Sequence, residues 1–69
     1  MDKETVKLKV NPADISFVNW IIEGYEHIGV VSTLDRENGI IIIRSTKDMM
    51  EDLLQIVDNF TFPVTFIYD

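Results

Sequence analysis

The pattern of apolar and polar residues along this chain predicts four β-strands and two α-helices. We expect strands at residues 5–10, 30–35, 39–44 and 64–68, where β-branched residues are frequent. We expect helices at residues 12–27 and from Ser45 or Thr46 through the apolar positions that end at Phe60, because apolar residues recur there every three or four positions. The predicted order is therefore strand, helix, strand, strand, helix, strand.

Residues 39–44 are expected to form a central strand of the sheet. Their sequence, Gly-Ile-Ile-Ile-Ile-Arg, contains four successive β-branched residues, which disfavour a helix. Successive side chains of a strand point to opposite faces of the sheet. A run in which every residue is apolar therefore requires contacts on both faces. Asn38-Gly39 lies between two apolar runs and predicts a hairpin that joins residues 30–35 to this strand.

The hairpin decides which side chains share a face of the predicted sheet. Leu34 and Ile41 are expected to share the face that the helices cover, together with Val30 and Ile43. The opposite face is expected to carry Val31, Thr33, Asp35, Ile40, Ile42 and Arg44. A bulge within the hairpin would invert part of this assignment.

The first helix is more apolar than one packed face requires. Asn11 suits its N-cap and Pro12 its first position. The stripe expected to face the sheet consists of Ile15, Val18, Ile21, Ile22 and Tyr25. Phe17 and Trp20 lie beyond this stripe, so the apolar arc covers about 220° of the helix, whereas one packed face needs little more than 100°. These two residues either fill a gap against the second helix and the final strand or serve as interface anchors, a role in which Trp is frequent.

This element order predicts an α+β, ferredoxin-like βαββαβ sandwich, as one domain over residues 1–69. Its four-stranded antiparallel sheet has the strand order 4-1-3-2, and right-handed crossovers place both helices on one face. The other face is then open, and an exposed aliphatic patch there would mark an interaction site. The residues expected on the open face are Val31, Ile40, Ile42 and Ile67, surrounded by Lys7, Lys9 and Arg44.

Composition narrows the classes of partner. The 69 residues carry a net charge of −6, which argues against non-specific binding of nucleic acid or anionic membranes. The chain contains no cysteine that could reinforce its small core, and a domain of this size often gains stability by oligomerising. The N-terminal residues lack the features of a signal peptide and no apolar run is long enough to span a bilayer, so we expect a soluble cytoplasmic protein.

No residue pattern predicts an enzyme, a metal site or a cofactor. His27, the single histidine, has Glu23 four residues before it, but zinc typically requires three or four ligands. A solvated Glu–His pair near the helix C-terminus is the simpler interpretation. No nucleophile–base pair or oxyanion loop can be named, so we expect no catalytic activity.

The chain resembles an uncharacterised bacterial family, the domain of unknown function 4911. The segments that carry the resemblance are IIEGYE (residues 21–26) and VVSTLD (residues 30–35), followed by Gly39. The resemblance spans most of the chain. It implies no established activity, cofactor or catalytic residue.

The element order also resembles that of ACT-type regulatory domains, which bind amino acids at domain interfaces. Those domains commonly carry Gly after a Pro at the start of the first helix, whereas Ala13 follows Pro12 here, so the resemblance supports the architecture more than ligand binding. Acylphosphatases are similar in topology but use an arginine in a loop that corresponds to residues 11–14, which contain none. The RNA-binding fold of this topology stacks bases on aromatic residues, at positions that here hold Lys7, Lys9, Ile40 and Ile42.

The sequence therefore predicts a small non-catalytic interaction or regulatory module that acts as a homodimer. The candidate interface residues are Phe17, Trp20, Val31, Ile40, Ile42, Arg44 and Ile67. The rival hypothesis is an ACT-like amino-acid sensor with a site near residues 11–14 and the N-terminus of the first helix. No nucleic-acid, membrane or cofactor partner is expected.

Overall fold

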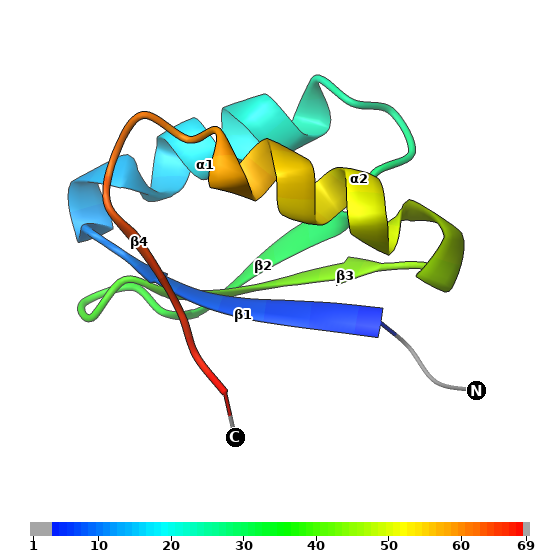
Figure 1. Cartoon of the computed structure of the whole chain (residues 1–69). Coiled ribbons are helices and arrows are strands. Elements are labelled where there is room, and N and C mark those ends of the chain that lie inside the picture. The colour runs from blue at the N-terminus through cyan, green and yellow to red at the C-terminus, as the bar shows by residue number, and fades with distance from the viewer. Residues whose placement is uncertain (1–3, 69) are drawn as a thin grey trace.

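The computed structural model describes residues 4–68 and shows a two-layer α+β sandwich (Figure 1). In chain order its elements are β1 (Glu4–Val10), a 3-10 turn η1 (Pro12–Asp14), α1 (Ile15–Glu23), β2 (Val30–Asp35), β3 (Ile40–Ser45), α2 (Lys47–Asp58) and β4 (Val64–Phe66). The antiparallel sheet has the order β2-β3-β1-β4, which is the predicted order 4-1-3-2 read from the opposite edge. The ferredoxin-like prediction is confirmed.

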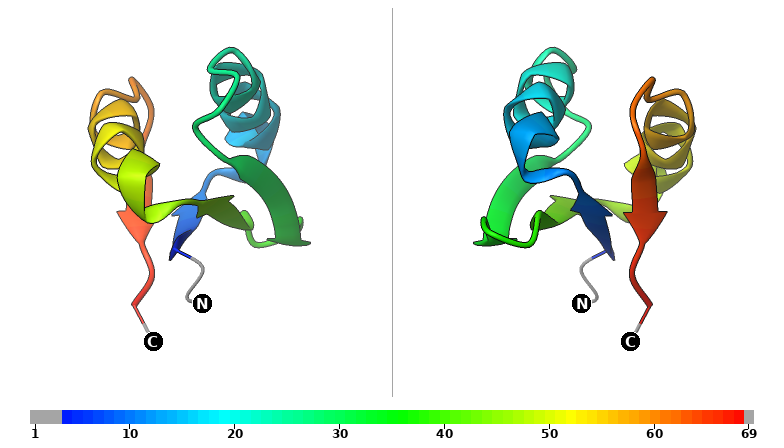
Figure 2. Two further views of the ribbon diagram at one scale, coloured as in Figure 1. Left: turned by 90° about the vertical axis from the view of Figure 1, so that its right-hand side faces the viewer. Right: turned by 90° about the vertical axis from the view of Figure 1, so that its left-hand side faces the viewer.

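Both helices lie on one face of the sheet, and the described chain places no helix or strand on the other (Figure 2). The core forms between these layers, where β1 and β3 pair with Val6 opposite Ile43 and Leu8 opposite Ile41. Leu8, Ile41 and Ile43 are fully buried because alternate residues of a strand point to the same face. The helices contribute Ile15, Val18, Ile22, Leu53 and Val57 to the same cluster.

The first helix is shorter than predicted at both ends. The Asn11 side chain accepts a hydrogen bond from the Ala13 N–H at 3.2 Å, but residues 12–14 form the 3-10 turn. At the other end α1 stops at Glu23, and the N–H of Tyr25 bonds the Ile22 carbonyl three residues back. The chain leaves the helix here and brings Ile28 into the core, with 5% of its surface exposed. Tyr25, expected in the buried stripe, is consequently 49% exposed.

A bulge in the hairpin inverts the predicted facing of β2. The register pairs Val31 with Ile43 and Thr33 with Ile41, and then shifts so that Asp35 lies opposite Ile40. The extra residue at the bulge is Leu34, which is 52% exposed rather than buried under the helices. Val31 therefore faces the core instead of the open face, and Val30, opposite Arg44, is 66% exposed. The predicted positions of Val30, Val31, Thr33 and Leu34 were wrong for this reason.

The turn before β3 is fixed by Gly39 and by Asp35. Gly39 has φ +72°, a left-handed conformation that favours glycine, and its carbonyl accepts a 2.8 Å hydrogen bond from the Val10 N–H. A Cβ at this position would collide with the Val10 carbonyl oxygen. The Asp35 carboxylate accepts hydrogen bonds from the Asn38 backbone N–H at 3.2 Å and from its side-chain amide at 2.8 Å. These bonds hold the pKa of Asp35 below its usual value.

The second helix begins after Thr46, so the structure resolves the choice between two possible caps. The Thr46 hydroxyl accepts a hydrogen bond from the Met49 N–H at 3.3 Å. Ser45 belongs to β3, and its hydroxyl donates instead to the Ile28 carbonyl at 2.6 Å. This bond ties the end of β3 to the loop that leads into β2.

Replacing Gly39 with alanine should destabilise the protein strongly. The Gly39→Ala variant combines the cost of a left-handed φ with a backbone collision, so we expect the free energy of unfolding to fall by at least about 2 kcal/mol. The measurement is the urea midpoint followed by far-UV circular dichroism. Gly24→Ala is the matched control, because Gly24 has φ −68° and should change stability by less than about 1 kcal/mol. Equal midpoints for the two variants would contradict the role assigned to Gly39.

The Asp35 carboxylate should titrate in a way that depends on Asn38. The ionised Asp35 carboxylate stabilises the hairpin fully at pH values above its unfolded-state pKa. This stabilisation is lost as the pH falls through the lowered folded-state pKa. In the Asn38→Ala variant, carboxyl-detected NMR titration should show the pKa of Asp35 raised towards its usual value. Lys9→Met should raise it less, because the Lys9 charge is a smaller cause than the Asn38 hydrogen bonds. A larger effect from Lys9→Met would contradict this order.

Candidate interaction surfaces

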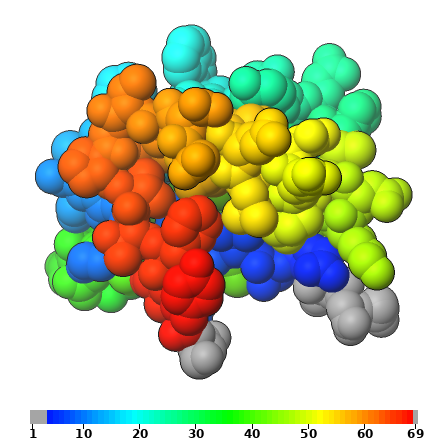
Figure 3. Space-filling view, in the orientation of Figure 1, coloured from blue at the N-terminus to red at the C-terminus, as the bar shows by residue number. Residues whose placement is uncertain are grey.

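The outer side of α1 carries two exposed aromatic residues. Phe17 is 54% exposed and Trp20 is 73% exposed, because the core-facing residues of the helix lie on its opposite side. Ala13 and Gly24 are also exposed and lie one helical turn from them in sequence. We call this surface the aromatic flank, defined as Ala13, Phe17, Trp20 and Gly24. In the space-filling view, side chains of α1, in cyan, project from the top of the molecule (Figure 3).

Phe17 and Trp20 have different surroundings. The Phe17 ring lies 6.2 Å from that of Phe62, which in turn lies 4.9 Å from that of Phe60, so a row of aromatic rings joins α1 to the segment before β4. Packing against Phe62 therefore covers part of the Phe17 side chain, as the gap-filling interpretation predicts. The same interpretation does not explain Trp20, whose side chain is the more exposed of the two. Residues 4–68 thus leave most of the Trp20 side chain exposed, as an apolar anchor on the outer side of α1.

The aromatic flank is uncharged in a strongly acidic chain. None of its four residues ionises, whereas the protein carries a net charge of −6. Acidic residues outnumber basic ones around both helices, where the ionisable groups are Asp14, Glu23, Glu26, Lys47, Asp48, Glu51, Asp52 and Asp58. The flank is thus a neutral apolar surface on the acidic side of the molecule.

The open sheet face combines aliphatic and basic side chains. Ile40, Ile42 and Ile67 lie there half-buried, as predicted, and Arg44 is exposed. Val31 is absent from this face and Val30 takes a place on it, because of the bulge at Leu34. We define the open sheet face as Thr5, Lys7, Lys9, Val30, Ser32, Asp35, Ile40, Ile42, Arg44, Thr65 and Ile67.

Two cations of this face, Lys9 and Arg44, donate hydrogen bonds to neutral oxygens. Lys9 Nζ donates to the Asn38 carbonyl at 3.0 Å, and Arg44 Nη1 donates to the Ser32 hydroxyl at 3.1 Å. Neither bond compensates the positive charge. Among residues 4–68, Asp35 is the acidic residue of the face, and the Lys9 charge contributes to lowering its pKa. Within that part of the chain the open sheet face carries more basic than acidic residues, while the helix side is acidic.

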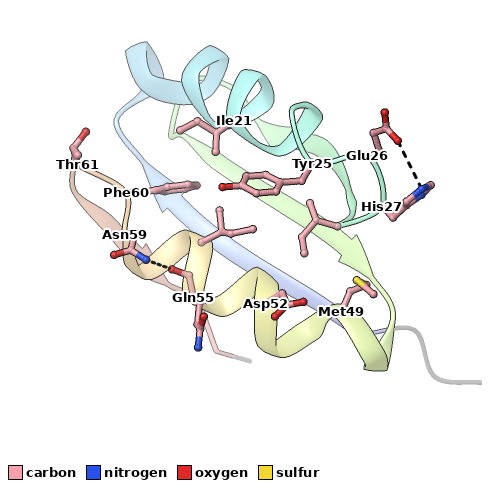
Figure 4. A pocket seen from close by; sticks show the side chains of 12 residues that line it. Ile21, Tyr25, Glu26, His27, Met49, Asp52, Gln55, Asn59, Phe60 and Thr61 are labelled. Carbon is pink, nitrogen blue, oxygen red and sulfur yellow. Dashed lines mark hydrogen bonds and ion pairs between the residues drawn. The ribbon is translucent and has the colours of Figure 1, made fainter.

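A groove of about 620 Å³ runs between the C-terminal end of α1 and α2 (Figure 4). Its apolar lining comes from Ile21, Tyr25, Ile28, Met49, Ile56 and Phe60. The rings of Tyr25 and Phe60 point towards each other across the groove, and Asp52 lies beside it on α2. The sequence analysis missed this site because Tyr25 was assigned to the core. The excess apolar arc of the first helix was the available signal.

His27 lies at the edge of the groove, beside Glu26. Its side chain is 87% exposed and its Nε2 lies 3.9 Å from Glu26 Oε1, so its acidic neighbour is Glu26 rather than the expected Glu23. Both Glu26 and His27 point away from the groove (Figure 4). Among residues 4–68, no three His, Asp or Glu side chains come together as a metal site would require. Within the same residues, no helix has the length and apolar character to cross a bilayer.

Comparison with known proteins places the chain in a family. The family model described as Domain of unknown function (DUF4911) matches residues 8–64, from the middle of β1 to the start of β4. No curated protein and no solved structure matches the chain significantly. The matched segment includes the whole of α1, the β2–β3 hairpin and α2. The chain therefore belongs to the DUF4911 family.

Proposed function

We propose that this protein is a small non-catalytic interaction module that acts as a homodimer, in which the aromatic flanks of two copies meet. The observation that carries the proposal is the 73% exposure of Trp20. A Trp side chain buries about 150–250 Å² in a core or an interface. With 73% of Trp20 exposed, covering it would remove about 110–180 Å² from water and contribute about 3–4.5 kcal/mol at about 25 cal/mol per Å². Exposed Trp side chains of this kind are frequent interface anchors.

A twofold contact through the aromatic flank avoids electrostatic repulsion. In a twofold dimer the same patch of each copy faces itself, so any charge on the patch meets a like charge. The flank has none, whereas the open sheet face would bring Lys7, Lys9 and Arg44 of two copies together. Two Trp20 side chains alone would give about 6–9 kcal/mol against association costs of about 4–15 kcal/mol, so a stable dimer is expected to need Phe17 as well.

The dimer should be disrupted by a charge placed on the aromatic flank. At high micromolar concentration, light scattering after gel filtration should give twice the chain mass of 8.0 kDa for the wild type. Trp20→Glu should give a monomer, because two buried carboxylates would face each other. Tyr68→Glu is the matched control: Tyr68 is 84% exposed and lies at the C-terminal end of the sheet, so the variant should stay dimeric.

Fluorescence gives a second readout, because Trp20 is the single tryptophan of the chain. Its emission should shift to the red on dilution, as the dimer separates and the indole enters water. A wild-type monomer at high micromolar concentration with red-shifted emission that is independent of concentration would overturn the proposed dimer. Dissociation by Tyr68→Glu together with a dimeric Trp20→Glu variant would place the contact elsewhere.

The groove between the helices supports amino-acid sensing as a second candidate function. Its volume of about 620 Å³ is typical of small-molecule sites, and none of residues 11–14, where the site was expected, lines it. Asp52 could pair with an ammonium group beside the apolar lining. Among residues 4–68, no Lys or Arg lines the groove to pair with a carboxylate, which is why we rank sensing below self-association.

A thermal-shift screen tests the sensing function. If the groove holds an amino acid, at least one apolar amino acid at millimolar concentration should raise the melting temperature, and Tyr25→Ala should abolish that shift because the ring lines the groove. Trp20→Ala, which alters the outer side of the same helix, should preserve it. A screen without a stabilising amino acid would exclude this function.

A further inference from the structure

We propose that the open sheet face binds an acidic amphipathic helix of another protein. The face is distinct from the aromatic flank, since the two lie on opposite layers of the sandwich (Figure 1). The proposal therefore does not depend on the homodimer.

The register places the side chains of this face in three rows. In the middle row Ser32, Ile42 and Lys7 are neighbours across β2, β3 and β1. In the row nearest the hairpin, Ile40 lies between Asp35 and Lys9, and in the third row Arg44 lies between Val30 and Thr5. Across the two central strands, each isoleucine of this face therefore lies opposite a lysine, Ile40 opposite Lys9 and Ile42 opposite Lys7.

The aliphatic part of the face is only partly shielded by the chain itself. Ile40 and Ile42 remain half-buried, although Ile41 and Ile43 of the same strand are fully buried under the helices. Val30, beside Arg44, is 66% exposed. Covering these side chains would be favourable, because each buried aliphatic side chain contributes about 1.5–3 kcal/mol. The partner must therefore present an apolar stripe.

The charges of the face select an acidic partner. Arg44 and Lys9 donate hydrogen bonds to neutral oxygens, and Asp35 of the same face offsets part of the Lys9 charge. Carboxylates beside an apolar stripe would pair with Lys9 on β1 and with Arg44 at the end of the isoleucine row. A basic partner would instead meet like charges. The basic residues of the face therefore favour an acidic partner, and its isoleucines favour one that also carries apolar side chains.

The dimensions of the face fit one helix better than a whole domain. Along the strands, the three rows and their side chains span about 20 Å. Across the strands, β1 and β3 together present a band about 10 Å wide. A helix is about 10–12 Å in diameter and covers 20 Å with about 13 residues. The whole four-stranded face measures about 400 Å². That is half of the roughly 800 Å² that each partner buries in a standard interface between folded proteins.

The helices of a second copy do not match this face. The outer side of α1 is apolar but uncharged, and α2 exposes acidic residues with Leu54 as its most exposed large apolar side chain. Neither combines an apolar stripe with flanking carboxylates. Nucleic acid is also a poor match, because the face has no aromatic residue for base stacking and belongs to a chain of net charge −6. An acidic helix from a different protein satisfies both requirements.

Two synthetic peptides test the proposal with the intact protein. Both are helices of about 14 residues with the same leucine stripe, flanked by Glu in one and by Lys in the other. In fluorescence anisotropy the Glu peptide should bind with a Kd of about 10–100 μM and the Lys peptide at least about tenfold more weakly. Binding of the Glu peptide should weaken when NaCl is raised from about 50 to about 500 mM, because salt screens exposed charge pairs.

Charge-reversal variants locate the binding site. Arg44→Glu and Lys9→Glu should each weaken binding of the Glu peptide by about tenfold or more. Lys47→Glu makes the same charge change at the exposed start of α2 and should leave binding unchanged. Trp20→Glu should also bind normally, which separates this surface from the proposed dimer contact. Circular dichroism confirms that each variant is folded.

Several outcomes would overturn the proposal. Equal binding of the Glu and Lys peptides would remove the electrostatic argument, and equal losses in Arg44→Glu and Lys47→Glu would show that only net charge matters. Binding of single-stranded poly-uridine without binding of the Glu peptide would assign the face to nucleic acid. Loss of peptide binding in Trp20→Glu but not in Arg44→Glu would assign the peptide to the aromatic flank.

Discussion

The pairing of β1 with β3 is the constraint on which the rest of the structure depends. It aligns Leu8 with Ile41 and Val6 with Ile43, and this aliphatic layer is the floor on which both helices pack. Because neighbouring residues of a strand face opposite ways, the same pairing commits Ile40 and Ile42 to the other side of the sheet. A strand of four successive isoleucines thus produces a core and an apolar outer surface at once. The two short helices α1 and α2 cover the core-facing side of the sheet and leave its other side open.

The position of the helices explains why α1 is apolar over so much of its circumference. One side packs on the sheet through Ile15, Val18 and Ile22. Another lines the groove through Ile21, with Tyr25 just beyond the end of the helix, because α1 and α2 stand apart rather than packing tightly together. The third side is the aromatic flank. Each excess apolar position of the sequence therefore corresponds to a surface that the chain itself leaves partly uncovered.

The sequence predicted the architecture because its strongest signals are local. The isoleucine run, the Asn38-Gly39 turn and the cap at Asn11 each specify a conformation within a few residues. The facing of β2 was not predictable in this way, since one extra residue at Leu34 inverts it and no sequence signal marks the bulge. The exposure of Trp20 was equally inaccessible, because it depends on where β4 and α2 lie relative to α1. Ile40, Ile42 and Arg44 were placed correctly since they belong to the strand with the clearest pattern.

The two outermost strands of the sheet have a consequence for how this protein can associate. On one side β2 is interrupted by the bulge at Leu34, and on the other β4 has only three residues and follows Pro63. Irregular or very short outer strands offer few free backbone groups in register, so they are poor templates for a strand from another chain. This arrangement disfavours edge-to-edge polymerisation of the sheet. The surfaces that stay open to contact are therefore formed by side chains rather than by main-chain ladders.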